Sequence, residues 1–104
     1  MDIQQILNGC QWFQWDQGND LKSWLKHHVS KSEAEQVFFN EPLLLVVDQG
    51  HSHQEARFRG LGYTDERRFL FIVFTIREDF VRIISVRDMN KKEKVDYEKF
   101  KAGA

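Results

Sequence analysis

The chain of 104 residues has one cysteine, one proline and no long apolar run. The lone Cys10 excludes an internal disulfide framework and a multi-cysteine metal site, and we expect it to be a small buried residue. No segment approaches the roughly 18 apolar residues of a membrane helix. The acidic start, "MDIQQILNGC", is unlike a signal peptide. These absences favour one cytoplasmic domain spanning residues 1–104, with no membrane association.

The chain also has little net charge, −1, but that charge is unevenly distributed. Residues 1–50 carry 3 Lys+Arg against 7 Asp+Glu, a balance of −4, whereas residues 51–104 carry 12 against 9, or +3. The apolar fraction of 41% and the charged fraction of 30% are typical of a folded domain. A local positive patch in the second half can bind phosphate even though the whole chain is nearly neutral.

Apolar periodicity predicts an α+β fold. The expected elements are a helical turn at 2–8, a strand within 10–16, a helix ending near His27, a helix after Ser30, strands at 43–48, 55–64, 69–76 and 81–87, and a helix after Asn90. Asp16, Ser30 and Asn90 are expected N-caps, the last two within capping boxes. Because the strands follow one another, we expect a small antiparallel sheet with helices packed on one face, in the order β-α-α-β-β-β-β-α.

The helix expected before His27 places Leu21, Trp24 and Leu25 at helical spacing. We therefore expect an apolar face on this helix. All three tryptophans, at positions 12, 15 and 24, are expected in the core rather than as platforms for stacked bases.

Three arginines, Arg77, Arg82 and Arg87, surround the predicted hairpin "FTIREDFVRIISVR". Composition alone favours ion pairs with the nearby acids at positions 78, 79 and 88. On the preceding strand, Glu55 and Arg57 share one face, and the opposite face carries Phe58 and two glycines, so it should pack inward. Without further information, this pair is also a surface ion pair.

The length of the hairpin turn decides which side chains meet across it. A two-residue turn at Glu78–Asp79 places Thr75 opposite Arg82, whereas a three-residue turn places Thr75 opposite Ser85. One residue of slip moves a strand's side chains to the other face. We prefer the three-residue turn because it directs the apolar side chains of the second strand toward the core.

Several short segments, in order and spacing, resemble the BrnT toxins of bacterial toxin–antitoxin pairs. They are "KHHVS", the spaced His, Glu and Arg around "EARFRGLG", "FTIR", and "RIISVR" followed by a glutamate and a tyrosine. The resemblance runs from about Trp12 to Tyr97. It implies a RelE-like fold, RNA cleavage without a metal, and a cognate antitoxin resembling BrnA, of the ribbon-helix-helix type, which would link the toxin to DNA.

The chain departs from the family pattern at three positions on the first helix. Asn19 stands where the family usually has lysine, Ser23 where it has asparagine, and His28 where it has glycine. A glycine there would suit a left-handed helix end. The departures motivate a second hypothesis, a toxin-fold protein that binds RNA or an antitoxin without cleaving RNA.

Cleavage of RNA through its 2′-hydroxyl needs a base, an acid and positive charge around the phosphorane. Arginine suits phosphate, and histidine or a carboxylate can move the protons. The catalytic candidates are His51, Glu55, Arg57, Arg77 and Arg87, and the predicted RNA contacts are Thr75, Arg82, Ser85 and Lys26. No cofactor or metal is expected, because no cysteines or paired carboxylates complete a site with His51 and His53.

Overall fold

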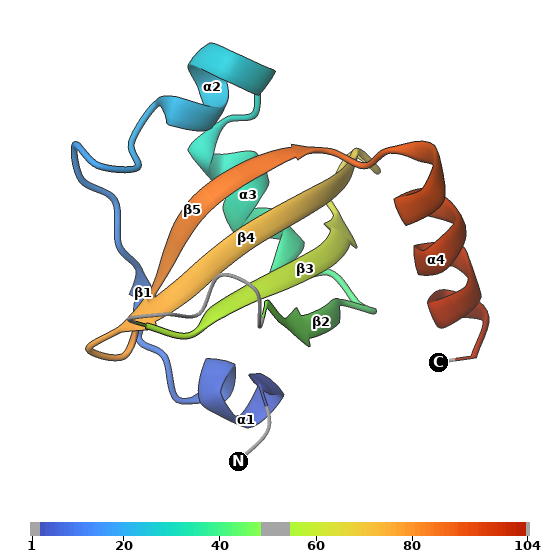
Figure 1. Ribbon diagram of the computed structural model, residues 1–104, viewed down its shortest axis with the longest axis horizontal. Coiled ribbons are helices and arrows are strands. Elements are labelled where there is room, and N and C mark those ends of the chain that lie inside the picture. Colours follow the sequence, from blue (N-terminus) through green and yellow to red (C-terminus); the bar gives the residue numbers. More distant parts are fainter. Residues whose placement is uncertain (1–2, 49–54, 104) are drawn as a thin grey trace.

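The computed structural model describes residues 3–48 and 55–103, which form four helices and a five-stranded sheet (Figure 1). The elements are α1 (Ile3–Asn8), β1 (Trp12–Phe13), α2 (Lys22–His27), α3 (Lys31–Val37), β2 (Leu44–Val47), β3 (Arg57–Tyr63), β4 (Phe69–Arg77), β5 (Phe80–Asp88) and α4 (Lys91–Ala102). The α+β class is confirmed, although the order opens with α1, which we expected only as a turn. Among the described residues, no helix has the length and apolarity to cross a membrane.

The strand order is β1-β5-β4-β3-β2. Strands β2 to β5 form an antiparallel meander, as expected. Strand β1 runs parallel to β5, with Trp12 opposite Phe80 and Phe13 opposite Val81, so the sheet is mixed rather than wholly antiparallel. Such a parallel pair needs a long connection, and here the rest of the sheet lies between the two strands in sequence.

The core lies between the sheet and α3. Ala34 and Val37 of α3 are fully buried against Phe58 and Phe74, so the predicted inward face of β3 is confirmed. Gly62 on that face permits the close approach, because a Cβ atom there would lie 2.7 Å from Cγ1 of Val37. A side chain at Gly62 would therefore push α3 from the sheet.

Helix α4 lies at the far end of the strands (Figure 1) and contacts the opposite face of the sheet. Tyr97 is fully buried, its ring is 6.1 Å from that of Phe69, and its hydroxyl donates a hydrogen bond to the carbonyl of Pro42. Both predicted capping boxes, at the starts of α3 and α4, are confirmed.

The hairpin between β4 and β5 has a two-residue turn, so our preferred register was wrong. Glu78 and Asp79 both have positive φ, Arg77 pairs with Phe80, and Thr75 lies opposite Arg82. The apolar side chains of β5 still reach the core because a β-bulge shifts the register at Ile84. After the bulge, the side chains of β5 therefore point to the faces of the sheet that the three-residue turn would have given them.

The outer edge of β5 beyond β1 is covered by side chains of the segment leading into α2. The Asn19 amide nitrogen donates hydrogen bonds to the carbonyls of Ile83 and Gln14. The Ser23 hydroxyl accepts one from the amide of Val86. Asn19 and Ser23, two of the departures from the family pattern, therefore satisfy backbone hydrogen-bonding groups along the edge of β5.

Helix α2 differs from the expectation at its start and on its apolar face. It begins at Lys22 after Leu21, so Asp16 does not cap it. The side chains of Leu21, Trp24 and Leu25 are exposed rather than buried, as is Trp12, which corrects our placement of two of the three tryptophans. The reason is position: α2 lies beside the β5 edge, where its outer side has no sheet to cover.

Arg68 joins the helices to the sheet. Its guanidinium donates to both carboxylate oxygens of Asp88 at the end of β5, and to Glu33 in the capping box of α3. It also donates to the carbonyls of His27 and His28, which end α2. One side chain thus satisfies carbonyls that a helix end leaves unpaired.

Replacing Glu78–Asp79 with Asn-Gly should stabilise the protein. Each left-handed non-glycine residue costs roughly 1 kcal/mol, and Asn-Gly is favoured in this turn. We expect the free energy of unfolding, measured by urea denaturation, to rise by about 1–2 kcal/mol. A Glu66→Asn control in the β3–β4 turn should change little, because the φ of Glu66 is not positive. An Asn-Gly variant no more stable than wild type would contradict the strain argument.

Candidate functional site

The face of the sheet opposite α3 carries five arginines, which we call the arginine face: Arg57, Arg59, Arg77, Arg82 and Arg87. They come from β3, β4 and β5. Arg82 precedes the bulge in β5 and Arg87 follows it, so both share this face although they are an odd number of positions, five, apart. The two residues from β3, Arg57 and Arg59, are two positions apart, as side chains on one face of a strand must be.

Near the β4–β5 hairpin turn, three residues on the arginine face form a row across β3, β4 and β5. Arg57 pairs with Thr75, and Thr75 pairs with Arg82. Strand spacing puts the two arginine backbones roughly 10 Å apart, within reach of one phosphate for such long side chains. Thr75 lies between them, 1% exposed, and its hydroxyl donates to the carbonyl of Ala56.

Arg77 is paired with Glu55 through two hydrogen bonds, from Nε to Oε2 at 3.0 Å and from Nη2 to Oε1 at 2.8 Å. These bonds lower the pKa of Glu55, and the positive charges of Arg77, Arg57 and Arg82 lower it further. Glu55 and Arg77, both predicted site residues, are therefore in contact, and Glu55 is ionised at neutral pH.

Arg82 is held by the loop after β1. Its two terminal nitrogens donate to the two oxygens of Asp16, at 2.7 and 2.9 Å, and one also donates to Oε1 of Gln14. The arginine side chain is only 11% exposed. The bonds from Arg82 and from the amide of Gly18 lower the pKa of Asp16. The loop after β1 thus fixes the orientation of an arginine distant in sequence.

Arg87 lies at the other end of the face, near α4. It donates to both oxygens of Glu93, at 2.8 and 2.9 Å, and its guanidinium lies 4.2 Å from the ring centre of Phe71. The same glutamate accepts the amide of Asn90 in the capping box. Hydrogen bonds from Arg87 lower the pKa of Glu93, with a further contribution from the charge of Arg59.

The other predicted site residues have different surroundings. Ser85 is on the arginine face, opposite Val73, whereas Lys26 is an exposed residue of α2. His51 and His53 lie outside the described residues. In residues 3–48 and 55–103, no group of three or more His, Cys, Asp or Glu side chains is placed to hold a metal ion.

Sequence reasoning missed Arg59 and two of the carboxylates. The signal for Arg59 was present, since it follows Arg57 by two positions on the same strand. Ion pairing does occur, but not with the acids next to the hairpin arginines: Arg82 pairs with Asp16 and Arg87 with Glu93. No local pattern links Asp16 to an arginine 66 positions away.

Glu93→Gln should destabilise the protein at neutral pH but not in acid. Glutamine keeps the capping box and removes the charge paired with Arg87. Because folding lowers the pKa of Glu93, its stabilisation is present above about pH 4.3 and is lost as the pH falls through the folded pKa. Urea denaturation should show a deficit of about 1 kcal/mol at pH 7 that shrinks as the pH falls through the lowered pKa of Glu93. A deficit independent of pH, or an equal one in Glu98→Gln, would contradict this account.

No curated protein matches the chain. A family model described as "Ribonuclease toxin, BrnT, of type II toxin-antitoxin system" matches residues 15–93. That range includes most of the chain, with β2 to β5 and every residue of the arginine face. The chain therefore belongs to the BrnT family of ribonuclease toxins.

Proposed function

We propose that the chain is a cytoplasmic endoribonuclease toxin that cleaves RNA without a metal ion, through attack of the 2′-hydroxyl on the adjacent phosphate. A cognate antitoxin, resembling BrnA and of the ribbon-helix-helix type, neutralises it and connects it to DNA. The observation that carries the proposal is the row formed by Arg57 and Arg82 on either side of Thr75, with Arg77 next to it.

The arginines supply the positive charge that this reaction needs. A phosphorane carries more negative charge than the phosphate, and guanidinium groups fixed in place stabilise that charge without reorganising. Arg57, Arg77 and Arg82 would surround the scissile phosphate. Arg87 and Ser85, farther along β5, would bind the RNA chain beside it, and Thr75 would support the row from beneath.

Proton transfer is assigned to His51 rather than to Glu55. An efficient general base has a pKa near the working pH, and the bonds from Arg77 lower the pKa of Glu55 away from that range. Glu55 therefore serves mainly to orient Arg77. At position 51, four residues earlier in the sequence, stands a histidine, the residue type suited to proton exchange near neutral pH.

One observation favours the alternative, a protein that binds RNA or the antitoxin without cleavage. Arg77, Arg82 and Arg87 are each engaged by a carboxylate through two hydrogen bonds. A phosphate must replace or share those partners. If the carboxylates remain in place, the face binds RNA weakly and stabilises no phosphorane.

Cleavage of labelled RNA in EDTA separates the two functions. The wild type should cleave. Arg57→Ala should fold yet lose about 100-fold or more in rate, the usual effect of removing one electrostatic donor. Arg87→Ala should fold and lose activity because it binds the RNA chain more weakly. Arg67→Gln, which removes the same charge from an exposed turn, is the matched control and should retain the wild-type rate.

Three results would contradict the proposal. Loss of wild-type cleavage in EDTA with recovery in magnesium would refute the metal-free reaction. RNA binding without turnover in any condition would favour the alternative function. Equal rates in wild type and both alanine variants would remove the arginine face from the mechanism.

A further inference from the structure

The outer side of α2 exposes a group of large apolar side chains, which we call the α2 patch: Leu21, Trp24 and Leu25. They are 56%, 47% and 76% exposed. Single exposed apolar residues are ordinary, whereas a contiguous group marks a surface that contacts another molecule. All three residues of this group lie within five consecutive positions, 21–25.

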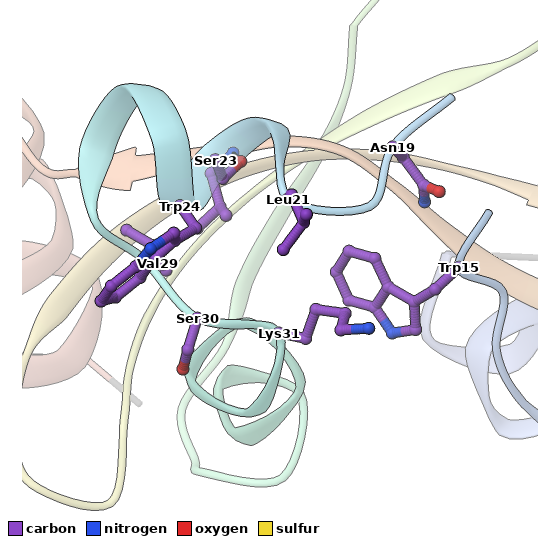
Figure 2. Close-up of a pocket in the computed structure, with 9 residues that line it drawn as sticks. Trp15, Asn19, Leu21, Ser23, Trp24, Val29, Ser30 and Lys31 are labelled. Carbon is purple, nitrogen blue, oxygen red and sulfur yellow. Dashed lines mark hydrogen bonds between the residues drawn. The ribbon is translucent and has the colours of Figure 1, made fainter. Parts of the chain in front are cut away.

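The α2 patch borders an apolar pocket of about 320 Å³. Figure 2 shows Trp24 and Trp15 at opposite ends of the pocket with Leu21 between them, and Val29 lies beside Trp24. Val86 of β5 also lines it. A cavity of roughly 150 Å³ already accommodates benzene, so this pocket has room for a large apolar side chain. Val29 and Val86 belong to the core side of the sheet, so the pocket does not open on the arginine face.

Backbone strain supports a role for the α2 patch beyond stability. Leu21 and His28, immediately before and after α2, both have left-handed backbones, with φ of 63° and 54°. Each costs roughly 1 kcal/mol for a residue other than glycine. Strained residues of this kind are common where a ligand is held. Because the strain at Leu21 accompanies an exposed side chain, burial within the isolated chain does not offset it.

The charge around the patch selects among occupants. Lys22 and Lys26 are exposed beside it, whereas Lys31 is paired with Asp20 at 3.0 Å. A second copy in a two-fold contact would bring the same lysines together, which is unfavourable. RNA would match the lysines but not the almost wholly apolar lining of the pocket. A protein segment with apolar anchors and flanking carboxylates matches both.

We propose that the α2 patch is the docking site of the antitoxin, which inserts an apolar side chain of an amphipathic helix between Trp15 and Trp24 and places acidic residues beside Lys22 and Lys26. The inference rests on the proposed function only in taking the partner to be an antitoxin. An amphipathic helix lying in an apolar groove is a common recognition mode. The contact anchors the antitoxin on the side of the sheet opposite the RNA-binding arginines.

The test is a binding titration with the purified antitoxin encoded by the adjacent gene, using calorimetry and full-length toxin. Trp24→Ala, Leu25→Ser and Lys22→Glu should each weaken binding by about tenfold or more, as for central interface residues. The matched controls on α4 are Val95→Ser, an exposed apolar residue, and Lys99→Glu. Both should bind within about twofold of wild type, since they lie away from the predicted interface.

Leu21→Gly separates binding from folding. Glycine removes the left-handed strain together with the apolar side chain, so the free energy of unfolding should be unchanged or higher while antitoxin affinity falls about tenfold. A purely structural role for Leu21 predicts the reverse, a less stable protein with normal affinity. Cleavage by Leu21→Gly and Leu25→Ser should equal that of wild type and should resist antitoxin concentrations that inhibit wild type.

The outcomes are distinguishable. Wild-type affinity in all patch variants would overturn the docking site. Loss of RNA affinity with unchanged antitoxin affinity would assign the patch, including Lys26, to RNA and would also overturn it. A wild-type protein that binds the antitoxin at the patch but cleaves no RNA would refute the proposed ribonuclease and leave the docking site standing.

Discussion

The arginine face depends on one extra residue in β5. The two-residue turn puts Arg82 on the open face, and uniform alternation from there would direct Ser85 and Arg87 into the core. The bulge at Ile84 changes the phase, so Ile83 and Val86 are both buried while Arg82 and Arg87 share the other face. Arginine side chains at both ends of one strand face are thus compatible with a continuous apolar core.

Local signals predicted most of the fold, and longer-range effects account for the errors. The capping boxes and the inward face of β3 depend on residues within a few positions, and both were found. The hairpin register was predicted wrongly because we assumed uniform alternation in β5, and a bulge has no clear pattern in one sequence. Helical spacing on α2 was real, but spacing does not say whether a helix covers a sheet or lies beside its edge.

The arginines show the same limit at the level of the site. Residue type, strand parity and the family resemblance together made Arg57, Arg77 and Arg87 candidates, while the partners of Arg77 and Arg87 could be found only in three dimensions. Asp16 reaches Arg82 across 66 positions, and Glu55 reaches Arg77 across 22. Arg68, absent from our candidates, bonds to two carboxylates and two carbonyls and serves the fold by joining α2, α3 and the end of β5.

The parallel pairing of β1 with β5 has a consequence for the order of folding. Strands β2 to β5 pair with their sequence neighbours, so they can assemble through short loop closures. Strand β1 has two residues and meets β5 only across the length of the domain, which makes it the costliest pairing to close. The segment that carries Asp16 is therefore expected to join last and detach first, and each detachment would release Arg82 from its carboxylate while the four-stranded meander stays formed.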